Sequence, residues 1–137
     1  MKAAIEDKAK SYCAVVWCKN PITPGACDKL SELQNLDIKQ KTPIRVLHRR
    51  SALVRDKKVY RFYAQYINDH YMLLHVLASA GTYIKELVHG DMGRTEPNVG
   101  QLLANECDIL QLDVTNVYDS LNEVKHMTNV ELFSALN

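Results

Sequence analysis

Long apolar runs, low-complexity tracts and secretory signals are all missing from this 137-residue sequence. No stretch approaches the roughly 20 apolar residues that a membrane-spanning helix needs, and Met1–Lys10 is charged where a signal peptide would be apolar. With 47% apolar and 24% charged residues, the composition is that of one globular domain or part of one. We therefore expect an intracellular protein, nuclear or cytoplasmic, with no membrane partner.

The sequence also lacks cysteines at the spacing of a metal site. None of Cys13, Cys18, Cys27 and Cys107 belongs to a CxxC pair. Cys13 and Cys18 lie an odd number of positions apart in a strand-like stretch, so they are expected to point to opposite faces of that strand. We expect free, buried thiols and no metal.

Charge is present but strongly uneven. The chain has a formal net charge of only +1, yet residues 39–58 carry +7 and the rest carries −6. In this segment only Asp56 opposes eight basic residues, which are Lys39, Lys41, Arg45, Arg49, Arg50, Arg55, Lys57 and Lys58. A basic face on a nearly neutral protein is typical of polyanion binding, although a solvated strand face without a partner would carry the same pattern.

The first half of the chain predicts a strand, a helix and an extended basic segment. Residues 11–18 alternate like a strand, and apolar side chains on both of its faces indicate a covered, central position. Thr23 and Pro24 form a helix start, Leu30 and Leu33 continue its apolar stripe, and the helix is expected to run to about Leu36. Residues 38–55 are predicted to be extended, because they contain a Thr-Pro pair and a residue before proline avoids the helical region.

The middle of the chain predicts an antiparallel hairpin. Two β-rich runs, residues 59–67 and 70–79, are separated by Asn68 and Asp69, a pair that tolerates tight turns. The residues expected to share one face are Tyr60, Phe62, Ala64 and Tyr66. These tyrosines are assigned to the core rather than to a platform for stacking bases.

The second half predicts helices around one more strand. Gly81 and Thr82 end the hairpin and can cap a helix with Ile84, Leu87 and Val88 on its buried side, ending near Gly90 and Gly93. Residues 99–104 are expected to be helical, and residues 108–118 alternate like a strand. Thr128 and Glu131 have the spacing of a capping box that opens a last helix, with the apolar residues Val130, Leu132 and Leu136.

Two stretches of the sequence resemble a known enzyme family. They are KTPIRVLHRRSALVR, from Lys41 to Arg55, and AGTYIKELVHGDMGRTEPNVGQLL, from Ala80 to Leu103. Both are similar to strings of the archaeal and eukaryotic tRNA pseudouridine synthases that modify uridines in the TΨC arm, as are the K-x-Y-x-A segment at Lys10–Ala14 and the segment DILQLDV. The resemblance covers roughly residues 8–118.

The resemblance implies a fold and a chemistry. The fold would be α+β, with a mixed, mostly antiparallel sheet, flanking helices and an RNA cleft, present here only in part. The reaction would be the isomerisation of a flipped-out uridine in tRNA to pseudouridine, carried out by an aspartate without cofactor or metal. Tyr12 would stack on the uracil, and Lys85 would pair with the catalytic aspartate. The candidate RNA-binding residues are Lys41, Arg45, Arg49, Arg50, Arg55 and Arg94.

The catalytic aspartate of that family lies well upstream of the tyrosine strand, and here only eleven residues precede Tyr12. Asp7 stands in a charged, linker-like setting, and Asp91 matches a family position that is not the nucleophile. We therefore expect a fragment or truncated relative that lacks the aspartate loop. Its parts would be a charged linker at 1–10, the C-terminal part of the catalytic domain at 11–118 and a helical extension at 119–137.

Other interpretations stay open at this point. Tyr12 alone would be assigned to core packing, and Lys85 to a solvated lysine or a partner of Glu86 or Asp91. The chain could be a non-catalytic RNA-binding module of the same fold, or a protein-interaction module built on its acidic C-terminal helix. Cutting such a sheet would leave unpaired edges and expose Val15 and Trp17, so we expect assembly with itself or with a missing N-terminal half.

Overall fold

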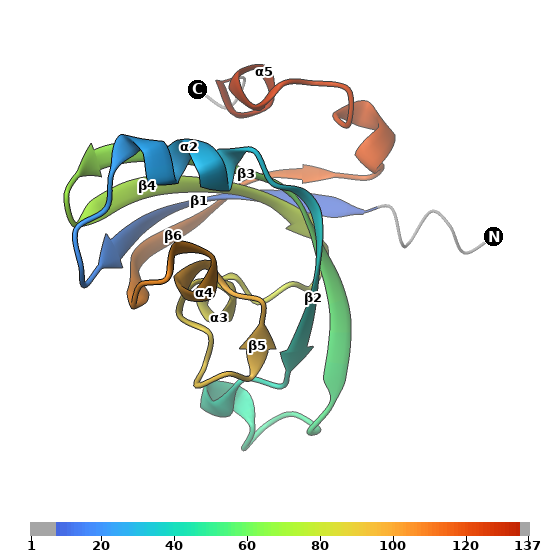
Figure 1. Ribbon diagram of the computed structural model, residues 1–137. Coiled ribbons are helices and arrows are strands. Elements are labelled where there is room, and N and C mark those ends of the chain that lie inside the picture. Colours follow the sequence, from blue (N-terminus) through green and yellow to red (C-terminus); the bar gives the residue numbers. More distant parts are fainter. Residues whose placement is uncertain (1–7, 135–137) are drawn as a thin grey trace.

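The computed structural model describes residues 8–134, which form one six-stranded sheet with helices on both faces (Figure 1). The strands are β1 (Ala9–Cys18), β2 (Gln34–Lys41), β3 (Val54–Asn68), β4 (Tyr71–Ser79), β5 (Thr95–Glu96) and β6 (Cys107–Tyr118). The helices are α2 (Pro24–Ser31), α3 (Ile84–His89), α4 (Val99–Leu103) and α5 (Asn129–Ser134), with short 3-10 turns η1 (Ile44–Val46) and η2 (Leu121–Glu123).

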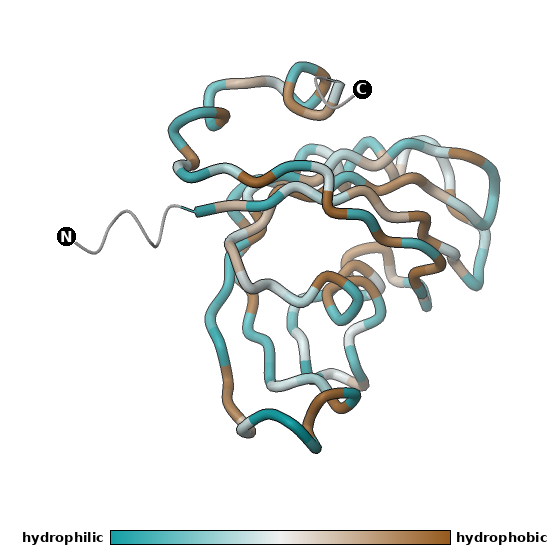
Figure 2. Tube along the Cα trace, turned by 180° about the vertical axis from the view of Figure 1, so that it is seen from behind, coloured by the Kyte–Doolittle hydropathy of each residue, from teal (hydrophilic) through white to brown (hydrophobic). Residues whose placement is uncertain are grey.

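The sheet has the strand order β5-β2-β3-β4-β1-β6, and its five described pairings are antiparallel. The predicted α+β class with a mostly antiparallel sheet is confirmed. α3 and α4 lie on one side of the sheet and α5 on the other (Figures 1 and 2). No helix in the described range 8–134 is long and apolar enough to cross a membrane.

β1 carries the alternation that its sequence predicts. Tyr12, Ala14, Val16 and Cys18 are at most 7% exposed and belong to the main core. The intervening Cys13, Val15 and Trp17 are half-buried. β1 is a central strand because β4 and β6 pair with its two edges. Only one of its faces is fully buried, and the other is half-buried.

The helix predicted from Thr23 begins as expected and ends earlier. The Thr23 hydroxyl accepts a hydrogen bond from Ala26 N at 3.1 Å, and Pro24 occupies the first turn. The helix ends at Ser31 rather than near Leu36, because residues 34–41 form β2 and pair with β3. Leu33 and Leu36 still pack against the core, but from a turn and a strand, so helical spacing was a misleading signal there.

The predicted extended segment 38–55 is interrupted. Residues 44–46 form η1, and Arg49 N and Arg50 N donate to Val46 O at 2.9 and 3.0 Å. The compact loop closes on the buried Thr42, whose hydroxyl donates to Ser51 O at 2.7 Å. Proline restricts the residue before it, but a φ of −59° at Pro43 also suits the start of a helical turn.

β3 and β4 form the predicted hairpin, but not every predicted face is right. Phe62 and Ala64 lie in the main core, whereas Tyr60 lies in a second cluster on the opposite face. The cause is a shift in register between Val59 and Arg61, where an extra residue is inserted opposite β4. A bulge reverses the alternation beyond it, and the sequence of β3 contains no glycine or proline that would signal one.

The other predicted elements are confirmed. α3 buries Ile84, Leu87 and Val88 and ends at Gly90, while α4 and β6 lie where the sequence places them. Thr82 does not cap α3; its hydroxyl donates to Ser79 O at 2.7 Å.

The second cluster fixes the C-terminal helix to the sheet. The capping box of α5 is present, with Glu131 N bonded to the Thr128 hydroxyl at 3.2 Å and Thr128 N bonded to the Glu131 carboxylate at 2.9 Å. The Phe133 ring lies 6.0 Å from Tyr63 and 5.2 Å from His75. α5 is therefore a packed part of the fold; Leu136 lies outside the described residues.

Candidate functional site

Tyr12 lies on β1 with its ring in the main core and 7% of its surface exposed. Its hydroxyl has no hydrogen-bond partner among residues 8–134, yet it is not one of the fully buried unpaired atoms, so it retains contact with solvent. Burial raises the pKa of the Tyr12 phenol above its ordinary value, so the group is neutral at neutral pH. A packed ring with a free hydroxyl fits both interpretations that the sequence left open.

Lys85 lies on α3 and is exposed. In the described part of the chain no acid forms an ion pair with it, so Glu86 and Asp91 are not its partners. Its exposure means that leaving the ammonium without a carboxylate carries no large desolvation penalty in this chain. Lys85 is therefore an available cation.

The structure brings Tyr12 and the helix of Lys85 to one side of the sheet. Ile84, next to Lys85, packs in the same core as Tyr12. α3 contacts β6, where Val114 is the strand partner of Tyr12 and is 57% exposed. No hydrogen bond joins the side chains of Tyr12 and Lys85 among the described residues.

Of the two candidate aspartates of the sequence, Asp91 is already engaged within the chain. Asp7 lies outside the described residues. The side chain of Asp91 accepts a hydrogen bond from Ile44 N at 3.0 Å and lies 3.6 Å from Arg94 Nε, with 11% of its side chain exposed. Asp91 therefore holds two segments of the chain together.

The basic segment forms an arm, residues 39–58, made of the ends of β2 and β3 and a tip at residues 42–53. Figure 1 shows the two strands running past α3 and α4 to the tip. On the strands, Lys39 pairs with Asp56 at 2.7 Å and Lys58 with Asp37 at 3.5 Å. Such exposed pairs contribute about 0–1 kcal/mol, so they offset charge without fixing the arm.

Lys57 is held differently, since its ammonium donates to Ala80 O at 3.1 Å. Partial burial, and to a lesser degree the charge of Arg55, lowers the pKa of Lys57. Arg55 is half-buried and donates to the Thr42 hydroxyl at 3.3 Å. Arg55 is thus bonded to the tip and Lys57 to the turn before α3, so neither presents a fully free charge to solvent.

The free positive charge of the arm lies at and beside its tip. Lys41, Arg49 and Arg50 are exposed and have no acidic partner within residues 8–134. Figure 2 shows this far end of the arm as a hydrophilic stretch beside apolar segments. In the tip, the apolar side chains of Leu47 and Leu53 are 37% and 51% exposed. The tip thus offers unpaired guanidinium groups next to apolar surface.

Arg45 and Arg94 are already engaged within the chain. Arg45 makes a two-pronged contact with Glu86, Nε to Oε2 at 2.7 Å and Nη2 to Oε1 at 3.2 Å, and the hydrogen bond to Glu86 raises the pKa of Arg45. Its guanidinium also lies 5.8 Å from the centre of the Tyr83 ring. Arg94 Nη2 donates to Thr42 O at 2.8 Å. Both arginines hold the tip, and the side chain of Arg45 remains 49% exposed.

Glu86 is the residue that sequence reasoning missed. Its side chain is 2% exposed, and a carboxylate that deep in a protein needs a charged partner. Helical spacing gave no signal, because Glu86 lies two positions after Ile84 and so falls outside the apolar stripe of Ile84, Leu87 and Val88. Its partner, 41 positions earlier, could not be inferred from spacing.

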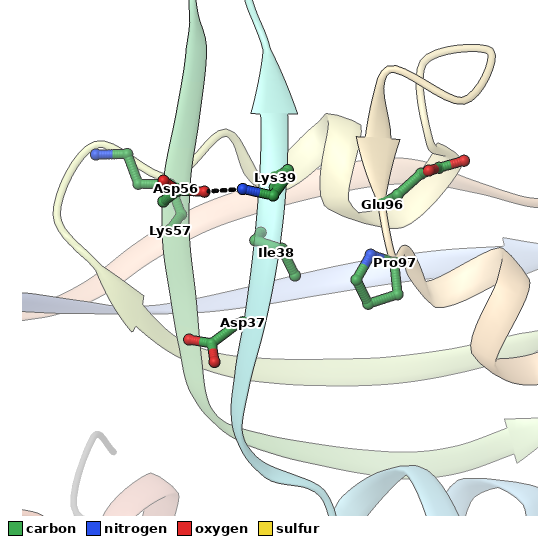
Figure 3. Close-up of a pocket in the computed structure, with 7 residues that line it drawn as sticks. All are labelled: Asp37, Ile38, Lys39, Asp56, Lys57, Glu96 and Pro97. Carbon is green, nitrogen blue, oxygen red and sulfur yellow. Dashed lines mark hydrogen bonds and ion pairs between the residues drawn. The ribbon is translucent and has the colours of Figure 1, made fainter.

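A cavity of about 560 Å³ lies beside β2 (Figure 3). It is lined by Asp37, Ile38, Lys39, Asp56, Lys57, Glu96 and Pro97. Figure 3 shows Lys39 and Asp56 pointing toward one another over the strand pair, with Glu96 on the far side of β2. None of the predicted site residues lines this cavity, and its three carboxylates make it a poor place for an RNA phosphate.

The protein family described as Pus10, C-terminal, matches residues 1–118. "tRNA pseudouridine synthase Pus10" of Homo sapiens is 46% identical over 117 residues, covering 85% of this chain and 22% of the relative. The protein of the same name from Pyrococcus furiosus is 44% identical over 115 residues, covering 82% and 29%. The chain thus spans less than a third of these relatives.

Solved structures show the same fold. A chain in the crystal structure of a Cbf5-Nop10-Gar1 complex superposes with a TM-score of 0.63 at 23% identity, covering 84% of this chain and 32% of that one. A chain of the archaeal box H/ACA sRNP Nop10-Cbf5 complex gives a TM-score of 0.54 at 21% identity, covering 83% and 30%.

Proposed function

Because the chain belongs to the Pus10 C-terminal family, we propose that it is the C-terminal part of the catalytic domain of a tRNA pseudouridine synthase, an isomerase acting on uridine in the TΨC loop of tRNA. The observation that carries the proposal is the 46% identity over 117 residues, which extends through the core of the fold. In this proposal residues 11–118 belong to the catalytic domain, residues 1–10 are a linker and residues 119–137 are an extension.

The proposed roles of Tyr12 and Lys85 follow from their settings. In the reaction the N1–C1′ glycosidic bond of uridine breaks, a C5–C1′ bond forms, C5 loses its proton and the freed N1 gains one, so the product is an isomer of the substrate. Tyr12 stacks on the flipped base. Its hydroxyl is a hydrogen-bonding group there rather than a phenolate, because a phenol is neutral at neutral pH and burial raises the pKa of Tyr12 further. The exposed ammonium of Lys85 pairs with the catalytic aspartate, which another part of the synthase supplies.

The proposed RNA contact is the arm. Arg49, Arg50 and Lys41 carry the unpaired charge, and guanidinium groups suit phosphates because they can donate two parallel hydrogen bonds. Arg55, Arg45 and Arg94 belong to the same proposed surface, although each also has a contact inside the chain. tRNA is the proposed partner.

The first experiment is to incubate the purified chain with an unmodified tRNA transcript and to assay pseudouridine in the TΨC arm. A binding titration at two salt concentrations, about 50 and 200 mM, accompanies the assay. We expect salt-sensitive binding without product from this chain alone, and product once the remaining part of a synthase is added. That product should disappear with Tyr12→Phe or Lys85→Ala.

Each other result has a distinct meaning. Product from the chain alone would show that it holds its own aspartate, and Asp7 and Asp91 would be replaced first. Salt-sensitive binding without product under either condition would support the alternative, a non-catalytic RNA-binding module. If the chain neither binds tRNA nor gives product, the proposal is contradicted.

We further propose that β6 is the strand on which a missing N-terminal half pairs. β6 ends the sheet, and β1 alone pairs with it among the described strands. Leu110, Val114 and Val117 on this strand are 61%, 57% and 58% exposed, and long apolar edge strands pair readily with other strands. The isolated chain should therefore self-associate through this edge.

Sedimentation velocity and thermal melts at several protein concentrations test this prediction. We expect oligomers whose share rises with concentration, and a larger monomer share with Val114→Lys and Val117→Lys, which replace exposed side chains and should leave the core intact. A sharp melt of a monomer that does not depend on concentration would contradict it.

A further inference from the structure

The segment between α3 and β5 turns in the left-handed sense over four consecutive residues. Gly90, Asp91, Met92 and Gly93 have φ of 85°, 50°, 58° and 86°. Glycine adopts this conformation freely, but aspartate and methionine do so at a cost, so the surroundings must hold them there. Hydrogen bonds from Gly93 N to Gly90 O at 3.0 Å and from Arg94 N to Asp91 O at 3.1 Å close the turn.

Three contacts of this turn and of Arg94 lead to the start of the tip. Asp91 Oδ2 accepts from Ile44 N at 3.0 Å, and Arg94 Nη2 donates to Thr42 O at 2.8 Å. Lys41 N donates to Arg94 O at 2.9 Å. The turn therefore binds backbone atoms on both sides of Pro43, the point at which β2 ends and the tip begins.

A third link comes from α3 itself. Glu86 receives the two-pronged contact of Arg45, which stands in η1. Because Glu86 is buried in the helix, the position of Arg45 is tied to α3 and not to solvent. Three side chains from residues 86–94 thus hold one short stretch of the tip, residues 42–45.

We propose that Glu86, Asp91 and Arg94 are positioning residues that fix the tip of the arm, and with it Arg49 and Arg50, relative to α3. Since α3 carries Lys85, the clasp formed by these three residues would hold the phosphate-binding end of the arm and the candidate catalytic lysine in one geometry. The RNA part of this inference rests on the proposed function. The clasp itself rests only on the contacts within the chain.

Asp91→Gly is the sharpest test of the clasp. It removes the acceptor of Ile44 N and the 3.6 Å ion pair with Arg94 while it relieves the left-handed strain, so loosening beyond that of a glycine control reports the lost contacts. Met92→Gly is the matched control, because Met92 is in the same turn and 91% exposed. Asp91→Asn keeps an acceptor oxygen and should restore the parent behaviour.

Hydrogen exchange and RNA binding are the measurements. In Asp91→Gly we expect the amides of Val46, Arg49 and Arg50 to exchange roughly tenfold faster, while the amides of β1 and β4 stay protected. RNA affinity should fall about tenfold with a shallower salt dependence. Met92→Gly should change neither quantity, and Asp91→Asn, which loses the same charge as Asp91→Gly, should leave exchange in the tip at the parent rate without weakening RNA binding.

Two results would overturn the clasp. One is unchanged exchange in the tip of Asp91→Gly, and the other is equal loosening in Met92→Gly. Hydrogen exchange tests the clasp even if the parent chain binds no RNA. In that case the proposed function is contradicted and the clasp is not. Faster exchange in the tip with unchanged RNA affinity would retain the clasp and overturn its role in presenting the arm to RNA.

Discussion

Replacing both Arg49 and Arg50 by glutamate is expected to weaken tRNA binding roughly 100-fold at low salt, and to lower the dependence of log affinity on log salt by about two. Both side chains are exposed at the tip and neither has an acidic partner in the described range. Each would therefore contact phosphate without first breaking an ion pair. Removing two phosphate contacts reduces the release of counterions, and the two new carboxylates add repulsion.

The matched control is Lys19→Glu with Lys29→Glu, which changes the net charge by the same amount. Lys19 and Lys29 are also exposed and lie after β1 and on α2, outside the arm. Lys19 forms an exposed ion pair with Glu106 at 3.7 Å, which contributes about 0–1 kcal/mol. If RNA responds to net charge alone, the two double variants will weaken binding equally and the arm is not the interface. Thermal melts of both variants should match the parent, since surface substitutions of this kind shift stability little.

Periodicity predicted the fold wherever one face of an element is buried along its length. β1 and α3 are such elements, and their buried faces agree with the structure. The sequence misled where tertiary pairing overrides a local signal: residues 34–36 continue a helical spacing but are used by β2 to pair with β3. The bulge at Tyr60 is a similar case, because it depends on register with β4 and not on local composition.

The sequence predicted which residue types form the candidate site, but not which of their charges are free. The basic run marked the arm, but charge alone could not separate Lys39 and Lys58, which pair with acids, from Arg49 and Arg50, which do not. That distinction depends on the pairing of β2 with β3.

The clasp was even harder to predict from the sequence. Arg45 and Glu86 are 41 positions apart, and Ile44 and Asp91 are 47 apart. Only the fold brings such distant residues together.

The structure argues against the hypothesis that the acidic C-terminal helix is a protein-interaction module. α5 places Leu132 and Phe133 against the second cluster, where they are 1% and 3% exposed. Asn129 Nδ2 donates to Ser31 O and Phe62 O at 2.9 and 3.0 Å, which ties the start of the helix to α2 and β3. The apolar face that a docking helix would offer to a partner is thus used within the chain.

Tyr12→Ala should lower the free energy of unfolding by about 3–5 kcal/mol, because it removes a ring packed in the main core and leaves a cavity. Tyr12→Phe should change it by less than about 0.5 kcal/mol, because the hydroxyl has no hydrogen bond to lose within residues 8–134. Urea unfolding measures both values, with an unchanged slope as the check that the unfolded state is the same. The two substitutions together should show that the ring of Tyr12 stabilises the fold and that its hydroxyl contributes little to stability.

Tyr118→Phe provides the comparison that makes the result decisive. Tyr118 is buried to the same extent, 8% exposed against 7%, but its hydroxyl accepts a hydrogen bond from Asn116 Nδ2 at 3.2 Å. Its loss should cost about 0.5–1.5 kcal/mol. If Tyr12→Phe costs as much, the Tyr12 hydroxyl has a structural role and the core-packing interpretation holds. If Tyr12→Phe is neutral for stability and abolishes product in the complemented synthase, the hydroxyl acts on the uridine, because packing no longer explains its presence.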